Sequence, residues 1–193
     1  AKKLGIKEIY SIGGAQDIAA LAYGTKKIKK VDKIVGPGNI FVSNAKKIVF
    51  GDVGIDMIAG PSEITVVGDK FSKASWIAAD LLAQAEHDIN SQCILVTKEK
   101  KIIKNFLKNI SIALNNLPRK NIASRSLKKN GIIIFAHSDK QIIKVINEIA
   151  PEHLELNVTN YKKYLNKIYN SGSICIGKYS PMAVTDYNAG TNH

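Results

Sequence analysis

Two separated clusters of polar residues in this chain could bind a metal or move a proton. One is Gln84-Ala85-Glu86-His87, in a segment that favours a helix, and the other is Pro151-Glu152-His153, at an expected element boundary. Asp186 and His193 lie beyond them. Amides, imidazoles and carboxylates can ligate metals, and a carboxylate beside an imidazole can exchange protons with a substrate. The clusters therefore offer metal ligands and an acid/base pair.

The first cluster shares a helical face with a further polar residue. Because a helix turns by about 100° per residue, Asp80, Gln84 and His87 lie on one face of a segment that is otherwise apolar. Polar groups on such a face need a partner, which can be a metal, a network of side-chain hydrogen bonds or solvent. The spacing alone leaves these alternatives open.

In the second cluster, Pro151 restrains the backbone just before Glu152 and His153, so both side chains could face a cleft. Such a pair can abstract protons from an alcohol or a water. The alternative is a helix-start acid that happens to precede a histidine. His137 has no comparable neighbours, and we expect it to be structural.

The composition is that of a soluble globular protein. The 193 residues suffice for one substantial domain or two small ones, and 45% of them are hydrophobic. No apolar run approaches the roughly 20 residues that a membrane span requires. Cys93 and Cys175 each lie in an apolar run, which favours reduced, buried thiols over a disulfide. We expect a cytoplasmic protein with no membrane partner.

The net charge of +12 raises nucleic acid as a possible partner. However, Arg119 and Arg125 are the only arginines, whereas base readout favours Arg. The lysines are scattered through amphipathic segments without clustered aromatic residues. A solvated lysine-rich face is therefore the favoured interpretation, with no nucleic-acid partner.

The first part of the chain predicts two strand-turn-helix units, which imply a parallel sheet. Residues 7–12 and 31–35 are the expected strands, followed by the turns Gly13-Gly14-Ala15-Gln16 and Gly36-Pro37-Gly38-Asn39 and by helices ending near residues 23 and 49. Glycines in such turns let a ligand approach the backbone, and helix N-termini favour anions. Neither turn is a GxGxxG motif, so an ordinary tight loop is the alternative.

The second part is again α/β in pattern. We expect strands at 64–67, 92–97, 131–135 and 173–176, and helices at about 72–87, up to 114, at 139–149 and at about 158–169. The glycine-containing stretch 51–61 is a candidate interdomain crossing. We therefore expect two α/β domains, at residues 1–62 and 63–193, with the active site between them. The first residues lack an initiator Met and the last stop in a polar motif, so we expect an internal fragment of a longer chain.

Six motifs in order closely resemble the histidinol dehydrogenase family, over essentially all 193 residues. They are Gly-Gly-Ala-Gln, Val-Gly-Pro-Gly-Asn, Ala-Gly-Pro-Ser-Glu, Gln-Ala-Glu-His, Ala-Pro-Glu-His-Leu-Glu and Asp-Tyr-Asn-Ala-Gly-Thr-Asn-His. The resemblance implies two Rossmann-like domains with parallel sheets, both incomplete in this chain. It also implies a Zn2+-dependent enzyme of histidine biosynthesis that oxidises L-histidinol to L-histidine in two steps, using two NAD and passing through an aldehyde-level species.

The resemblance also assigns roles to particular residues. It makes Glu152 and His153 the acid/base pair, in which His153 accepts alcohol protons and Glu152 activates the water for the second step. The zinc ligands that it implies are Gln84, His87 and Asp186. The implied substrate contacts are Ser62, Gln84, His87, His153 and Asp186, and the implied NAD contacts are Gln16 and Asn39. Glu86 takes no role.

The chain also departs from the family pattern. The resemblance implies a homodimer in which a further zinc-ligating histidine and a substrate-binding glutamate come from a C-terminal domain across the dimer, and a tyrosine nearer the N-terminus contacts NAD; the chain contains none of these segments. Met182 and Thr185 replace residues expected as Glu and Gly. Alternatives are a same-fold dehydrogenase of another amino alcohol or a sulfonate, and an inactive relative.

Overall fold

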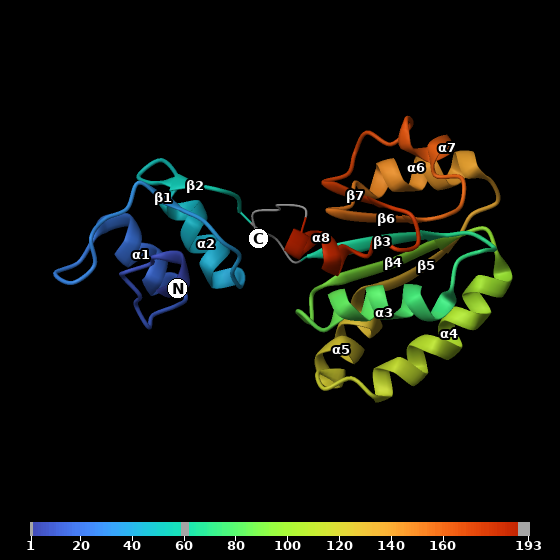
Figure 1. Cartoon of the computed structure of the whole chain (residues 1–193), viewed down its shortest axis with the longest axis horizontal. Helices are drawn as coiled ribbons and strands as arrows, with labels where there is room; N and C mark the ends of the chain where they lie inside the picture. Colours follow the sequence, from blue (N-terminus) through green and yellow to red (C-terminus); the bar gives the residue numbers. More distant parts are fainter. Residues whose placement is uncertain (1, 59–61, 189–193) are drawn as a thin grey trace. The chain divides into compact units, whose positions relative to one another are not determined.

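The computed structural model describes residues 2–58 and 62–188, and for residue 2 and residues 186–188 it describes the backbone alone. The chain divides into two compact units, with the division after residue 60 (Figure 1). Each unit is an α/β structure with a parallel sheet, as the sequence predicts.

The first unit is built around two short parallel strands. Its elements in order are η1 (Lys2–Leu4), α1 (Ala15–Tyr23), β1 (Lys33–Ile34), α2 (Ile40–Val49) and β2 (Gly54–Ile55). Strands β1 and β2 pair in parallel, joined by α2. The small core includes Ile18, Ile34 and Val49. The strand expected at residues 7–12 is absent from the described structure of this unit, where Ile9 is 70% exposed.

The second unit is a five-stranded parallel sheet with helices on both faces. Its elements are β3 (Glu63–Gly68), α3 (Ala74–Ala85), β4 (Gln92–Thr97), α4 (Lys100–Asn115), α5 (Lys120–Asn130), β5 (Gly131–Phe135), α6 (Asp139–Ile149), β6 (His153–Asn157), α7 (Lys162–Leu165), β7 (Ser173–Ile176) and α8 (Met182–Asn188). The strand order is β5-β4-β3-β6-β7. Within this unit the chain begins with the central strand β3, continues with β4 and β5 on one side of it, and then adds β6 and β7 on the other side.

The two faces of this sheet carry separate cores. Ile64 and Val66 of β3 pack with α3, α4 and α5, whereas Val67 packs with α6 and α7 (Figure 1). Because side chains alternate along a strand and β6 pairs with β3 in the register Ile64↔His153, the side chains of His153 and Glu155 face α3. Met182, the first residue of α8, belongs to the core on the α3 face.

Candidate active site

The starts of the parallel strands form one edge of the larger sheet, which we call the amino edge. Ser62 immediately precedes β3, and its carbonyl accepts a hydrogen bond of 3.2 Å from the N–H of Gln92 at the start of β4. Glu152 immediately precedes β6. Helix α3 runs back toward the start of β4, to which residues 86–91 connect it, so its last turn also lies at this edge. The fold thus gathers predicted site residues from three separate segments.

A carboxylate and an imidazole lie close together at this edge. Oε2 of Glu152 is 4.0 Å from Nδ1 of His153. The same Oε2 accepts a hydrogen bond of 3.3 Å from the N–H of Glu63. His153 is only 7% exposed, whereas the Glu152 side chain is 28% exposed. The pair therefore combines a buried imidazole, fixed on a central strand, with a carboxylate that solvent can reach.

Glu63 is a neighbour that the sequence analysis did not single out. It begins β3, where burial raises the pKa of its carboxyl group, and the negative charge of Glu152 raises that pKa further. Two carboxyl groups thus lie at the amino edge in different surroundings. The sequence offered only one signal for Glu63, its place in the Ala-Gly-Pro-Ser-Glu motif.

The two candidate zinc ligands of the first cluster lie at the end of α3. Gln84 is a buried residue of the last turn, and His87 is exposed just beyond the helix, where its N–H donates to the carbonyl of Gln84 at 3.2 Å. Arg119 holds the connecting loop by donating to the carbonyl of His87 at 3.4 Å. A buried amide and an accessible imidazole within one turn form a donor set acceptable to zinc.

The third candidate ligand, Asp186, lies on α8, but its side chain is outside the described part of the structure. Over residues 2–58 and 62–185, whose side chains are described apart from that of residue 2, no group of three His, Cys, Asp or Glu residues comes together. Gln84 is an amide and is not among those residue types. The donor set present in the described structure is therefore Gln84 and His87, with α8 supplying the backbone position of Asp186.

A second pair of carboxyl groups lies between α3 and β6, and the residue pattern alone predicted no role for it. Asp80 of α3 hydrogen bonds with Glu155 of β6, which is 3% exposed. Burial, together with the negative charge of Asp80, raises the pKa of Glu155 to about 8. Oε1 of Glu155 also accepts a hydrogen bond of 2.6 Å from the N–H of Met182.

In the first unit, the residues predicted to contact NAD are exposed on two glycine-containing turns. Gln16 lies in the first turn of α1, after Gly14, which has a φ of 80° that favours glycine. Asn39 is the N-cap of α2, and its Oδ1 accepts hydrogen bonds from the N–H groups of Phe41 and Val42 at 3.0 and 3.1 Å. The Asn39 side chain therefore has a structural role that its place in the motif did not reveal.

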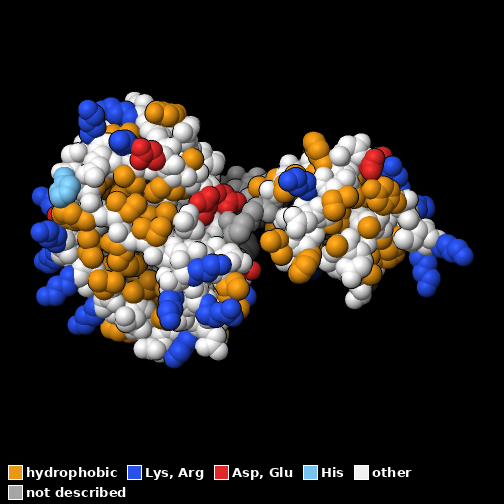
Figure 2. Space-filling model, turned by 180° about the vertical axis from the view of Figure 1, so that it is seen from behind, with side chains coloured by type: hydrophobic (Ala, Val, Ile, Leu, Met, Phe, Trp, Pro, Cys, Tyr) orange, Lys and Arg blue, Asp and Glu red, His pale blue; other side chains and the backbone are white. Residues whose placement is uncertain are grey.

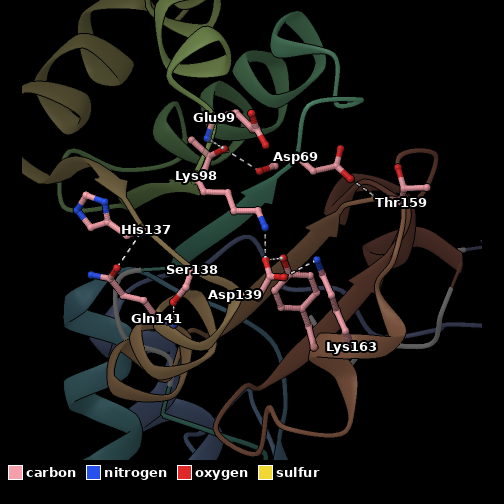
Figure 3. A network of polar contacts seen from close by, with 12 residues as sticks. Asp69, Lys98, Glu99, His137, Ser138, Asp139, Gln141, Thr159 and Lys163 are labelled. Carbon is pink, nitrogen blue, oxygen red and sulfur yellow. Dashed lines mark hydrogen bonds and ion pairs between the residues drawn. The ribbon is translucent and has the colours of Figure 1, made fainter.

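The opposite edge of the larger sheet, which we call the carboxyl edge, is where open α/β sheets usually bind ligands. Several polar side chains at this edge are paired with one another (Figure 3). Asp139 receives Nζ of Lys98 and of Lys163, each at 2.7 Å, and the hydroxyl of Tyr164 at 2.8 Å. Oδ2 of Asp69 accepts from the N–H of Thr159 at 2.7 Å. These contacts join the loops that follow four strands and are those of a structural network.

Basic side chains do not gather into a single patch on the face shown in Figure 2. Lys and Arg lie along the margin and across the lower part of the larger unit, while hydrophobic side chains collect over another part of the same face. This distribution agrees with a solvated lysine-rich surface. Among the residues that the structure describes, no helix is both long and apolar enough to cross a membrane. Cys93 and Cys175 are buried thiols, as predicted.

The parallel sheets and their flanking helices place this chain in the α/β class, with a carboxylate and an imidazole 4.0 Å apart at a strand-start edge. A family model for histidinol dehydrogenase matches residues 1–193, the whole chain. The chain belongs to the histidinol dehydrogenase family.

Individual relatives agree with the family match. The chain is 64% identical over 194 residues to histidinol dehydrogenase of Pelagibacter ubique (strain HTCC1062), and 53% identical over 193 residues to that of Listeria monocytogenes (strain EGD-e). Both alignments cover 100% of this chain and 45% of the relative. The crystal structure of histidinol dehydrogenase from Elizabethkingia anophelis superposes with a TM-score of 0.92 at 44% identity, covering 100% of this chain and 44% of that one. The chain thus spans a little under half the length of these relatives.

Proposed function

We propose that this chain forms part of a histidinol dehydrogenase, which oxidises L-histidinol to L-histidine in two NAD-linked steps through an aldehyde-level species. The observation that carries the proposal is the Glu152–His153 pair, with 4.0 Å between Oε2 and Nδ1, at the sheet edge where α3 also ends. Residues 63–193 would supply the catalytic and zinc-binding groups, and residues 1–62 would supply NAD contacts. The enzyme would act as a homodimer.

The proposed metal ligands are Gln84, His87 and Asp186. Bound zinc would supply a positive centre that holds and orients nitrogen atoms of the substrate. Gln84 suits this role because its amide is held in the buried last turn of α3, and His87 because its exposed ring can reach a ligand. Ser62, at the start of β3, is a further proposed substrate contact on the same edge.

His153 is the proposed general base for the substrate hydroxyl. Its position on a central strand fixes the ring, and its burial keeps bulk water from competing for the same proton. NAD, when bound, accepts the hydride in each oxidation. Glu152, which is more accessible to solvent, would take a proton from the water that converts the aldehyde-level species to the acid.

The cofactor contacts that we propose in the first unit are Gln16 and Asn39. Oδ1 of Asn39 is committed to capping α2, so its amide NH2 group is the part that would donate to the cofactor. The N-terminus of α2 also favours the negative charge of a pyrophosphate. This assignment uses both glycine-containing turns.

The proposal is tested by measuring NADH formation from L-histidinol by the complete, zinc-loaded protein, with a chelator-treated control. We expect two NADH per histidinol, lost on chelation. Gln84→Ala and His87→Asn should each lower zinc affinity about 10-fold or more, since each removes a ligand. Glu86→Gln is the matched control, because Glu86 lies between the two ligands and has no proposed role.

The outcomes separate the rival functions. Zinc affinity and turnover that are unchanged in both ligand variants would show that the metal assignment is wrong. Zinc binding without turnover of L-histidinol, followed by activity on a different amino alcohol, would identify a same-fold enzyme of other specificity. A folded protein that binds no zinc would be an inactive relative.

A further inference from the structure

We propose that Asp80 and Glu155 form a proton-sharing carboxyl pair that positions the two elements bearing candidate zinc ligands, α3 with Gln84 and α8 with Asp186. This inference rests on the proposed function. It adds two positioning residues, neither of which is a ligand or a catalytic group in that proposal.

The contact between the two carboxyl groups determines the protonation state of the pair. Asp80 and Glu155 hydrogen bond through their side chains. An ionised carboxylate has only acceptor oxygens, so a hydrogen bond between two carboxyl groups requires a proton on one of them. Burial of Glu155 to 3% exposure favours its neutral form. The pair therefore carries one proton and one negative charge.

The carboxyl pair connects the two helices that carry candidate zinc ligands. Asp80 lies four residues before Gln84, on the same face of α3. Glu155 accepts the Met182 N–H at 2.6 Å, and Met182 lies four residues before Asp186 on α8. Asp80 thus lies one helical turn before Gln84, and Glu155 contacts the residue one helical turn before Asp186. A change in their spacing would move both ligand-bearing elements.

The carboxyl pair is also linked to β6, the strand that carries His153. Glu155 lies two residues after His153, so both side chains point to the α3 face of β6. The same buried carboxyl group is therefore rigidly linked to the proposed general base. Through Asp80 and Met182 it joins β6 to α3 and to α8.

The surroundings of Glu155 contain few other ionisable groups. The neighbouring strands present Val66 on β3 and Cys175 on β7 at the same level of the sheet. Asp80 is the charged group from α3, and the Met182 N–H is the donor from α8. Cys175 lies 3.6 Å from Oγ1 of Thr185, so β7 also contacts α8 directly. Val66 and Cys175 carry no positive charge, so ionisation of both carboxyl groups would meet no compensating charge at these two strand positions.

The test is zinc affinity of the complete protein, measured by competition with a chromogenic chelator from pH 6 to 9. Glu155→Gln keeps an oxygen for the Met182 N–H and supplies a permanent donor to Asp80, so its affinity at pH 7 should stay within about threefold of the wild type. Glu155→Met fills a similar volume but loses both hydrogen bonds, and should weaken binding about 10- to 100-fold. Thr97→Val is the control, because it removes a buried hydrogen bond to Gly68 at the carboxyl edge and should leave zinc affinity unchanged.

The pH dependence of zinc affinity tests the shared proton directly, because a purely structural role of Glu155 would not change that dependence. Above about pH 8 the wild type should lose the shared proton, and its affinity should fall about tenfold relative to that of Glu155→Gln by pH 9. Asp80→Asn should flatten the profile in the same way, which keeps the test decisive if Glu155→Met fails to fold. A constant ratio between wild type and Glu155→Gln at all pH values would overturn the positioning role alone. Absence of zinc binding by the wild type would overturn the proposed function and this inference together.

Discussion

Nζ of Lys46 on α2 lies 2.8 Å from Oδ1 of Asp56, which follows β2, and both side chains are only 3% exposed. The same carboxylate accepts the N–H groups of Gly36 and Met57 at 2.8 and 2.7 Å, and Lys46 also donates to the carbonyl of Gly36. This buried ion pair therefore fixes the turn that ends in Asn39, a proposed NAD contact.

We predict that Asp56→Asn strongly destabilises the first unit. The substitution leaves the Lys46 ammonium buried without an anion, and breaking a buried pair in this way costs about 3–5 kcal/mol. Hydrogen exchange of the α2 amides measures the stability of the first unit separately from that of the second. The control is the double variant Lys46→Met with Asp56→Asn, which removes the cation too and should recover most of the loss. Unchanged α2 protection in the single variant would show that the pair contributes little.

The same pair gives a pH dependence with a definite sign. Burial acts to raise the pKa of Asp56, but the hydrogen bonds from Lys46, Gly36 and Met57 outweigh it and lower the pKa from 3.8 to about 2. A lowered pKa stabilises the fold above the unfolded value and loses that contribution as the pH falls through the folded value. The stability that depends on Asp56 should therefore disappear between about pH 4 and 2.

Asn39 allows the cap and the cofactor contact to be separated. Asn39→Asp keeps the oxygen that caps α2 but removes the NH2 donor and adds a negative charge, so we expect unchanged stability and a KM for NAD raised about tenfold. Asn39→Ala should raise the KM and also lower stability by about 1 kcal/mol. Steady-state kinetics of both variants measure the KM for NAD, and denaturant unfolding measures their stability. An Asp variant with the wild-type KM would rule out the cofactor role of Asn39.

The elements that the sequence predicts correctly are those whose burial is set by their own pattern. Strand β4 is an almost continuous apolar run and is buried over Cys93–Thr97, and the helix at Asp139–Ile149 begins with the N-cap Ser138, whose hydroxyl accepts the N–H of Gln141. Helix α5 was missed because only Ala123 and Ser126 are buried on it. Two buried positions are too few to give the helix a recognisable hydrophobic periodicity in the sequence.

Strand β6 shows why the site was harder to predict than the fold. The residue pattern predicts only an element boundary at His153, yet all five residues from His153 to Asn157 are buried. Glu155 can be buried because Asp80 of α3 and the Met182 N–H of α8 supply polar partners. These partners lie far away in the sequence, so they leave no local pattern. Residues 7–12 show the converse, because their pattern suits a strand but they pair with no strand in the described part of the chain.

We predict that Asp139→Asn leaves the proposed chemistry intact. Asp139 lies at the carboxyl edge, where hydrogen bonds from Lys163, Lys98 and Tyr164 outweigh burial and hold the pKa of Asp139 well below its ordinary value. Its side chain is 33% exposed, so solvent screening limits the expected loss of stability to about 1–2 kcal/mol. Zinc affinity and the KM for histidinol should not change. The exposed pair Lys144–Glu148 is the control, and Glu148→Gln should cost under about 0.5 kcal/mol.

Glu152→Gln should separate the two oxidation steps. The amide cannot take a proton from water, so conversion of the aldehyde-level species should slow about 100-fold or more, while the first oxidation by His153 continues. The expected readout is a fall from two NADH per histidinol toward one in single-turnover experiments. His153→Asn is the companion variant and should slow the first step itself. Equal slowing of both steps in Glu152→Gln would contradict the division of roles.

The buried carboxyl pair predicts a second pH dependence, opposite in sign to that of Asp56. Burial and then the charge of Asp80 raise the pKa of Glu155 to about 8, so between about pH 4.5 and 8 the folded state holds a proton that the unfolded state has lost. Stability therefore falls as the pH rises through this range, because the slope follows the difference in bound protons. Glu155→Gln cannot lose that proton, and its stability should become greater relative to the wild type from pH 5 to pH 8. Urea unfolding across this range measures the difference, and parallel curves for the two proteins would mean that Glu155 ionises normally in the fold.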